Sequence, residues 1–299
     1  MYNSNIIMNI SDSNFTNNGD RNQRLGGAIY ISQSLIAIYN SSFTNNTANE
    51  GGAVYFGCTS LANCNLTLTN STFSSNNAVR QGGAVYYDYV RPSFDRVEYS
   101  DNSAQYGPNI ASYPVKIRLV NSTHNDVSLN NVGSGIAYDQ TLNFGLYDYD
   151  DQVMVLDNSD QIAISAVDAQ TSSISGTNVG LLNQGVASFD NLIFVSTPGS
   201  TNILYRATSK VIDSNKIQNV FGQFISSNNI YVDFRYCKPG EIVTSSNQCQ
   251  VCSAGTYSFD WNSTECKNCL EDVVCNGGVN IEVSSEHWRR TTNSTKIIQ

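Results

Sequence analysis

The sequence predicts an all-β protein of three units: a short parallel β-helix, a β-sandwich and a small disulfide-rich module. Three observations predict it. Two short motifs recur together through the first 125 residues, alternating apolar and polar segments fill the middle, and six of the eight cysteines gather after residue 236. A length of 299 residues suits two or three such units, because domains cluster near roughly 100 to 150 residues.

The first unit, expected over residues 1–130, is indicated by an internal repeat. A Gly-Gly-Ala-Ile/Val-Tyr segment begins at residues 26, 51 and 82, with a worn fourth copy at 107. An aromatic-x-x-Asn element precedes each copy, beginning at Phe15, Phe43, Phe73 and Tyr99. Because apolar residues alternate within each unit, we expect coils of short strands that stack about 4.8 Å apart. Like residues then form columns: the four aromatics, the aliphatics Ile29, Val54, Val85 and Ile110, and ladders of Asn at the corners.

The composition agrees with stacked coils. Asn occupies 38 positions and charged residues only 14%, since a charge would repel its own copy one coil away. Each Gly-Gly pair suits a corner that requires positive φ and close contact between coils. The net charge of −9 argues against nucleic acid as a partner. No apolar run approaches the 18 or so residues needed to cross a bilayer, and the first residues lack the features of a secretory signal, so we expect membrane attachment only through segments outside this chain.

Alternating segments separated by turns predict a β-sandwich over residues 134–235. About seven short strands are expected in 95 residues, which is typical of that architecture. The segments are Leu142–Leu146, Val153–Leu156, Gln161–Ile164, Val186–Phe189, Leu192–Val195 and Ile230–Val232.

The cysteines predict cross-links. Cys58 and Cys64 flank an insertion in the repeat, which we interpret as a stapled loop rather than two free thiols. Residues 236–276 have little apolar sequence to hold them together, which favours disulfides in an oxidising setting. Six cysteines permit fifteen pairings, and we favour neighbours in sequence: Cys237 with Cys249, Cys252 with Cys266, and Cys269 with Cys275. The spacing of Cys249, Cys252, Cys266 and Cys269 would also suit zinc, but that site would strand the other two cysteines. Residues 277–299 are expected to be a truncated tail, and the chain a fragment of a larger protein.

Nine Asn-x-Ser/Thr sequons are candidate glycosylation sites, although a chain this rich in Asn and Ser generates many by chance. They lie at Asn9, Asn14, Asn40, Asn45, Asn65, Asn70, Asn121, Asn262 and Asn293. With the disulfides, they favour an extracellular location.

The paired repeat motifs resemble those of polymorphic outer-membrane proteins, from about Asn9 to Ile117. The resemblance implies a right-handed parallel β-helix. Tyr99 in place of Phe and Pro108 in place of the second Gly depart from the pattern in the last coil. Such repeats are displayed by bacterial surface autotransporters linked to adhesion, and also occur in large surface proteins of protists.

Two further resemblances concern the later units. The middle is similar to immunoglobulin-like modules of surface proteins, through the acidic turn after Tyr147 and the Gly-Val-Ala-Ser-Phe segment from Gly185. The Cys-x-x-Cys-x-x-Gly-Thr-Tyr-Ser run from Cys249 resembles the ephrin-receptor-like, growth-factor-receptor-type cysteine-rich repeat. That family implies disulfides and an extracellular stalk near a membrane, and no catalysis.

The sequence offers no catalytic constellation. A glycoside hydrolase on a β-helix needs two carboxylates across a groove, whereas the solenoid acids Asp88, Asp95, Glu98 and Asp101 fall in its worn last coils. The only histidines, His124 and His287, lie far apart in the sequence, and there is no Gly-x-Ser-x-Gly elbow. We therefore expect no catalytic residue, cofactor or metal.

Three weaker candidates for binding remain. Asp148, Asp150 and Asp151 could bind Ca²⁺ but lack the pattern of an EF-hand, so a solvated turn is favoured. Trp261, Tyr257 and Trp288 could form a contact surface, but packing over disulfides is favoured. Tyr30, Tyr55 and Tyr86 would bind a sugar or protein if they face outward, and inward packing is equally open.

These observations predict a non-enzymatic, surface-displayed or extracellular structural or adhesion module, part of a larger membrane-anchored protein. Its partner would be a protein or glycan at a cell surface or in extracellular matrix. Two alternatives are a carbohydrate-active β-helix enzyme, either a polysaccharide lyase or a hydrolase, and the ligand-sensing ectodomain of a receptor.

Overall fold

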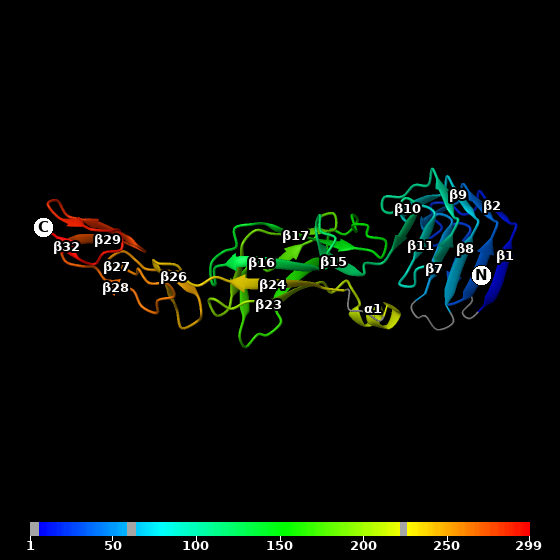
Figure 1. The fold of residues 1–299 in the computed structure, drawn as a ribbon. Coiled ribbons are helices and arrows are strands. Elements are labelled where there is room, and N and C mark those ends of the chain that lie inside the picture. The colour runs from blue at the N-terminus through cyan, green and yellow to red at the C-terminus, as the bar shows by residue number, and fades with distance from the viewer. Residues whose placement is uncertain (1–5, 59–63, 222–225) are drawn as a thin grey trace.

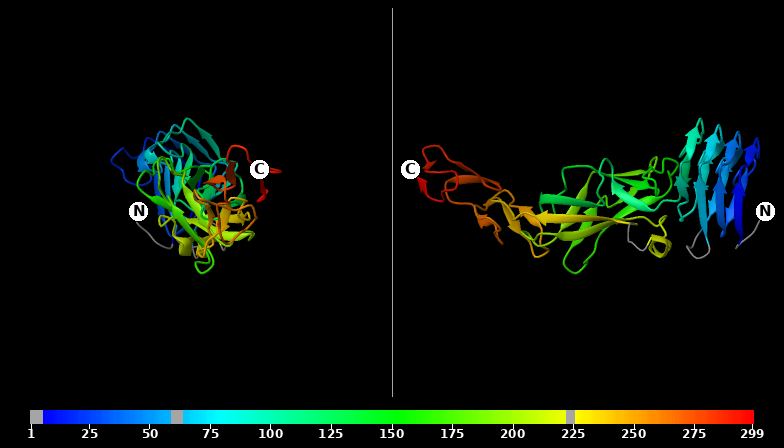
Figure 2. Two further views of the ribbon diagram at one scale, coloured as in Figure 1. Left: turned by 90° about the vertical axis from the view of Figure 1, so that its left-hand side faces the viewer. Right: turned by 45° about the vertical axis from the view of Figure 1, so that its right-hand side comes forward.

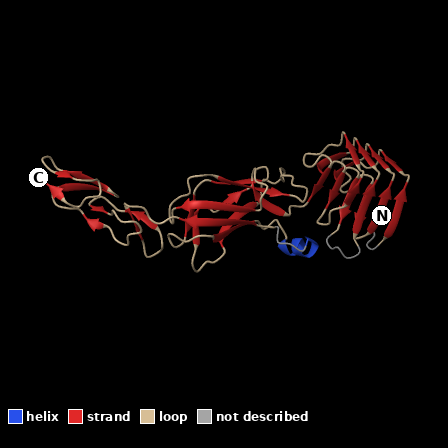
Figure 3. Ribbon diagram, in the orientation of Figure 1, coloured by secondary structure: helices blue, strands red, loops and turns tan. Residues whose placement is uncertain are grey.

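A computed structural model describes residues 6–58, 64–221 and 226–299. The chain forms an elongated rod in which three β-rich parts follow one another, with the two termini at opposite ends (Figure 1). The right-hand view of Figure 2 shows the same in-line arrangement, and the left-hand view looks along the rod. Almost all regular structure is strand, as predicted, and α1 (Ser214–Phe221) is the one α-helix in the described parts (Figure 3).

The first part is a β-solenoid of about four turns. Each sheet takes one strand from successive coils, and all of these strand pairs are parallel. One sheet holds β1 (Ile7–Ser11), β4 (Leu35–Tyr39), β8 (Asn65–Thr69) and β12 (Ser93–Asp95). The second holds β2 (Asn14–Thr16), β5 (Ser42–Thr44), β9 (Thr72–Ser74) and β13 (Glu98–Ser100). The third holds β3 (Ile29–Ser32), β7 (Val54–Gly57), β11 (Val85–Tyr87) and β14 (Ile110–Ser112), and β6 (Thr47–Glu50) pairs with β10 (Asn77–Gln81).

The predicted columns are confirmed. Ring centroids lie 4.8 Å apart between Phe15 and Phe43 and 4.6 Å apart between Phe43 and Phe73, with nearly parallel planes. Tyr99 continues the file 5.6 Å from Phe73. The aliphatic residues of the repeat pair in the same register from β3 to β14. Like residues therefore fill the interior, and a weakly charged sequence gains a dry core.

Buried Asn residues form the predicted corner ladder. The Nδ2 of Asn18 donates to Asn46 Oδ1, that of Asn46 to Asn76 Oδ1, and that of Asn76 to Asn102 Oδ1, each at 2.9 Å. Asn46 and Asn76 are completely buried. Their amides satisfy backbone groups that the corners leave without strand partners.

The first Gly of each pair occupies the left-handed region, with φ between 59° and 68° in all four copies. A Cβ on Gly52, the second of its pair, would lie 2.1 Å from the carbonyl oxygen of Gly83 in the next coil. Pro108 takes the same place in the fourth copy, where no described coil stacks on its far side. This explains why the last coil tolerates that departure from the repeat.

The middle part packs β-sheets around an apolar core that includes Phe144, Phe189, Phe194 and Tyr205. One sheet holds β15 (Lys116–Leu119), β17 (Leu142–Tyr147) and β21 (Val186–Phe189). The other holds, in spatial order, β16 (Asp126–Val132), β24 (Asn228–Phe234), β23 (Ile203–Thr208), β18 (Gln161–Ala166) and β20 (Val179–Leu181), and β19 (Ser173–Gly176) pairs with β22 (Leu192–Val195). All pairs are antiparallel except β16 with β24.

Two features of the middle part differ from the expected layout. Strands β15 and β16 precede residue 134, yet they pair with β17 and β24, because they carry the apolar alternation that completes these sheets. Helix α1 interrupts the predicted all-β segment and buries Ile217 and Val220 on one face. The limits of independently folding domains stay predictions.

The disulfide-rich part consists of two-stranded antiparallel sheets that follow one another along the sequence. They are β25 (Glu241–Val243) with β26 (Cys249–Val251), β27 (Thr256–Tyr257) with β28 (Lys267–Asn268), β29 (Val273–Gly277) with β30 (Asn280–Val283), and β31 (Trp288–Arg289) with β32 (Ile297–Ile298). Residues 277–299 thus continue in hairpins. Among the described residues, no helix has the length and apolar character needed to span a bilayer.

Candidate functional site

The solenoid meets the middle part through a joint of tyrosines and carboxylates, called the solenoid joint here: Tyr87, Arg91, Tyr106, Asp148 and Asp150. Tyr106 Oη donates to Asp148 Oδ2 at 2.6 Å, and Tyr87 Oη donates to Asp150 Oδ2 at 2.5 Å. Arg91 Nε donates to Asp150 Oδ1 at 2.8 Å. Burial raises the pKa of Asp148, against the hydrogen bonds that favour its charged form.

The acidic turn is only partly solvated: Asp148 is buried, Asp150 is half-buried and Asp151 is exposed. Asp151 lies 2.6 Å from Lys116 Nζ and 2.9 Å from Arg118 Nη1. Partial burial alone would raise the pKa of Asp151, but the hydrogen bonds and charges of these two residues lower it. Each of the three turn carboxylates thus has a donor from the protein itself.

The tyrosine column lies on the outer face of the third solenoid sheet. Centroids are 5.5 Å apart between Tyr30 and Tyr55 and 5.3 Å apart between Tyr55 and Tyr86. Yet Tyr55 and Tyr86 are only 7% and 1% exposed, because Leu25, Tyr106, Met154 and Leu156 pack around the column. The outward face is thus a second small core rather than an open binding platform.

The four solenoid acids named from the sequence do not come together, although the charge of Glu50 adds to the effect of burial on Asp88. Asp88 accepts a hydrogen bond from Tyr55 Oη at 2.8 Å, and burial raises its pKa to about 6. Asp95, in β12, is exposed and contacts Arg96 at 3.2 Å, and Glu98 and Asp101 are exposed in or beside β13, on a different sheet. His124 and His287 lie in the middle part and the carboxy-terminal hairpins, so the structure does not bring them together.

Disulfides join Cys58 with Cys64, Cys237 with Cys249, Cys252 with Cys266, and Cys269 with Cys275, the pairs expected between neighbours in sequence. The four sulfurs of the alternative zinc site are thus bonded to cysteines in three separate disulfides. The Cys58–Cys64 bond spans the base of residues 59–63, which lie outside the described chain.

A second joint, the cysteine joint, links the middle part to the disulfide-rich part: Ser134, Arg235, Glu241 and Asn247. Glu241 accepts from Arg235 Nη1 at 2.7 Å and from Nη2 at 2.9 Å. Ser134 Oγ donates to the carbonyl of Asn247 at 2.6 Å. Burial would raise the pKa of Glu241, but the hydrogen bonds from Arg235 and from the backbone of Lys238, together with the charges of both residues, lower the pKa.

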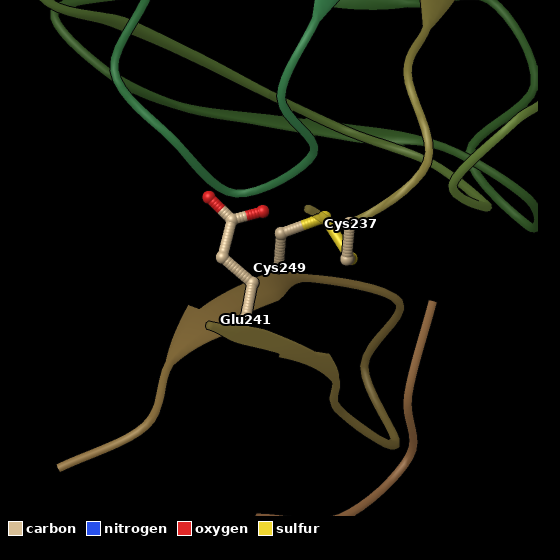
Figure 4. A group of neighbouring side chains, drawn as sticks. All are labelled: Cys237, Glu241 and Cys249. Atoms are coloured by element: carbon tan, nitrogen blue, oxygen red, sulfur yellow. A yellow bond between two sulfur atoms is a disulfide. The ribbon is translucent and has the colours of Figure 1, made fainter. Parts of the chain in front are cut away.

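The carboxylate of Glu241 lies beside the sulfurs of Cys237 and Cys249, with the three ligand-type atoms within 4.8 Å of one another (Figure 4). This grouping resembles a metal site only in composition. The two sulfurs are bonded to each other, so neither is a thiolate ligand. The carboxylate is held by the guanidinium of Arg235, and the cluster is a structural feature of the joint.

All nine sequon asparagines are exposed. The fully buried Asn46, Asn76 and Asn228 belong to no sequon. Asn40 and Asn70 stack at one corner, where Asn70 Nδ2 donates to Asn40 Oδ1 at 3.0 Å. Glycan attachment at the nine positions stays a prediction.

The aromatic side chains of the disulfide-rich part divide into two groups. Tyr257 is 3% exposed and packs with Phe259 and Cys275, so the interpretation as packing over disulfides holds for it. Trp261 and Trp288 are 62% and 53% exposed. Trp261 borders a hollow of about 770 Å³, the tail hollow, which is also lined by Lys238, Asn276, Glu282, Arg289 and Asn293.

The tail hollow is a cavity of the disulfide-rich part that the sequence did not predict. Its lining combines residues from 238 to 293, which no motif connects. The one signal was the occurrence of two tryptophans in sequence with almost no core.

The architecture defines a β-solenoid protein with a disulfide-rich carboxy-terminal region. In the solenoid, residues 40–57 match the Chlamydia polymorphic membrane protein repeat. The matched segment contains Phe43 and Asn46 of one motif and Gly51 and Gly52 of the other. The match identifies the repeat in part of one coil. No curated protein matches the chain significantly.

Proposed function

We propose that the chain is a non-catalytic extracellular spacer and adhesion module, which holds a β-solenoid away from a membrane as part of a larger anchored protein. The observation that carries this proposal is the rod itself. Three β-rich parts lie in line, the termini are at opposite ends, and hydrogen-bonded joints fix the parts to one another (Figure 1).

The resemblances support the same function. Proteins named for the matched repeat are membrane proteins of Chlamydia, which favours display at a cell surface. In the middle part, β15, β17 and β21 take the order of strands A, B and E of an immunoglobulin-like sandwich, and β18, β23 and β24 that of C, F and G. Local disulfides between neighbouring cysteines support an ephrin-receptor-like stalk and an oxidising compartment.

The positions of the acids favour binding over catalysis. The carboxylate with the most perturbed pKa in the solenoid, Asp88, is buried and held by Tyr55. A general acid must reach the substrate, and the tyrosines that would form the sugar platform are themselves covered.

The proposal is tested by coating beads with the purified chain and measuring attachment to cells and to glycan- or protein-coated surfaces. We expect attachment that rises with coating density and is competed by soluble chain. The same protein should release no product from neutral or acidic polysaccharides. Turnover that disappears in Asp88→Asn would favour the carbohydrate-active enzyme, and absence of attachment to every surface would leave only the spacer role.

A further inference from the structure

The tail hollow combines features of a ligand site that the proposed rod does not require. Its volume, about 770 Å³, lies within the range of small-molecule sites. Trp261 presents most of its indole to solvent at the border. The chain has only two tryptophans, and a small module with little core needs the stabilisation that a buried indole would give. An indole left exposed beside a cavity forgoes that stabilisation.

Two cations line the tail hollow, and they differ in how their charged groups are held. Arg289 donates from Nη1 to the carbonyl of Thr292 at 2.8 Å and from Nη2 to that of Ile281 at 2.7 Å, so its guanidinium is held in place while its charge stays uncompensated by an acid. Lys238 uses its backbone N–H to bind Glu241, and its ammonium has no hydrogen-bond partner among the described residues.

The one lining carboxylate is already engaged. Asn276 Nδ2 donates to Glu282 Oε1 at 2.7 Å. The hollow therefore holds two cations against one acid, on a protein whose net charge is −9. An anionic group is the complement that this local excess favours.

We propose that the tail hollow binds an acidic sugar unit of a glycan. The apolar face of the sugar ring packs on the indole of Trp261, the sugar carboxylate lies near Lys238 and Arg289, and a hydroxyl group binds the amide of Asn276. This inference rests on the proposed surface role, since it names a ligand class for one end of the rod.

The experiment uses Trp261 as its own reporter. In Trp288→Phe it is the only tryptophan of the chain, because the sequence contains two. The full chain is produced in a host without N-glycosylation, so that the sequons at Asn262 and Asn293 carry no glycan beside the hollow. Its fluorescence is titrated with a hexuronic acid oligosaccharide and with the neutral hexose oligosaccharide of the same linkage and length.

We expect a saturable change in fluorescence with a dissociation constant of about 0.1 to 1 mM for the acidic oligosaccharide, which corresponds to a binding free energy of roughly 4 to 5.5 kcal/mol. The neutral oligosaccharide should bind about tenfold more weakly. Raising the salt concentration should remove most of that difference, because the lining charges are exposed.

Three variants separate the parts of the proposal, with binding followed by calorimetry. Trp261→Ala should weaken binding of both oligosaccharides at least tenfold, and Lys238→Ala should remove only the preference for the acidic one. Trp288→Ala is the matched control: this indole is also exposed but does not line the hollow, so its loss should leave binding of both oligosaccharides unchanged.

Several results would overturn the proposal. They are equal affinity for the two oligosaccharides, unchanged binding in Trp261→Ala, or no saturable change in a chain whose four disulfides are shown to be intact. Binding without bead attachment would refute only the adhesion role. Attachment without binding here would refute only the sugar site, and would then favour a protein ligand.

Discussion

The Asn ladder is the feature that a single substitution tests most sharply, and Asn46→Ala is the change to make. The side chain of Asn46 makes four hydrogen bonds. Oδ1 accepts from the backbone N–H and Nδ2 of Asn18, at 3.0 and 2.9 Å. Nδ2 donates to Asn76 Oδ1 and to the carbonyl of Phe15, both at 2.9 Å.

The loss of stability in Asn46→Ala follows from the burial of the groups that lose their hydrogen-bond partner. A hydrogen bond contributes about 0.5 to 1.5 kcal/mol net, and more where a partner stays buried without a replacement. Asn46 is 0% exposed, so water does not reach the groups it leaves, while Asn18 lies at the accessible end of the ladder. Asn76 Oδ1 keeps the backbone N–H of residue 46. We expect the free energy of unfolding of the solenoid to fall by about 3 to 5 kcal/mol.

Urea unfolding followed by circular dichroism measures the change. Asn65→Ala is the matched control, since Asn65 is an exposed solenoid residue whose side chain makes only a 3.4 Å contact with Thr67. Its effect should stay within about 0.5 kcal/mol. If Asn46→Ala loses no more than Asn65→Ala, the ladder does not stabilise the coils, and the reasoning that amides replace charges in this sequence is wrong.

Three further changes test other parts of the fold. Gly52→Val should prevent the second and third coils from stacking, seen as loss of the cooperative solenoid transition, because its Cβ alone would lie 2.1 Å from a backbone oxygen. Asp88→Asn should stabilise the chain at pH 8 by about 2 to 3 kcal/mol but not at pH 4. A folded pKa of about 6, above the ordinary 3.8, means that stability is lost as pH rises between these values, and an unchanged pH profile would contradict the burial of this carboxyl. Arg235→Ala should loosen the cysteine joint at neutral pH, measured as a smaller end-to-end dimension by X-ray scattering. In the wild type the cysteine joint should weaken only in acid. The pKa of Glu241 is lower in the folded than in the unfolded chain, so its ion pair stabilises the joint above the unfolded pKa. This stabilisation is lost as the pH falls through the folded pKa.

The solenoid could be predicted from its repeat, because a fixed repeat length determines which residues lie above one another in successive coils. Once Phe15, Phe43 and Phe73 recur with their glycine corners, a parallel stack places them in one file, whatever the neighbouring sequence does. The disulfide pairs could also be predicted from local sequence, because each bond joins cysteines only 6 to 14 residues apart.

The middle part could be predicted only as a class of fold. Alternation shows that β24 is a strand, but not that it pairs with β16, about 100 residues earlier and in parallel. Helix α1 was not predicted, because a helix of eight residues with two buried apolar side chains shows little of the 3.6-residue hydrophobic periodicity that marks a helix. The partners of Asp148 and Asp150 lie 42 and 63 residues away in the solenoid, and no local pattern connects them.

The charges that the solenoid avoids reappear where the parts of the rod meet. A charge inside a coil would face its own copy 4.8 Å away, but a joint occurs once and so can hold opposite charges without repetition. Two ion pairs with buried or half-buried partners lie there: Arg91 with Asp150, and Arg235 with Glu241. Lys116 and Arg118 pair with Asp151 beside the solenoid joint, within the middle part. Pairs such as Lys267 with Asp260 in the disulfide-rich part are exposed and worth little. The coils are thus held by stacking, which salt hardly affects. The solenoid joint combines charge with the packing of Met154 and Leu156 on the tyrosine column, whereas the cysteine joint depends on the ion pair of Arg235 with Glu241. High salt or acid should therefore loosen the cysteine joint before it unfolds any coil.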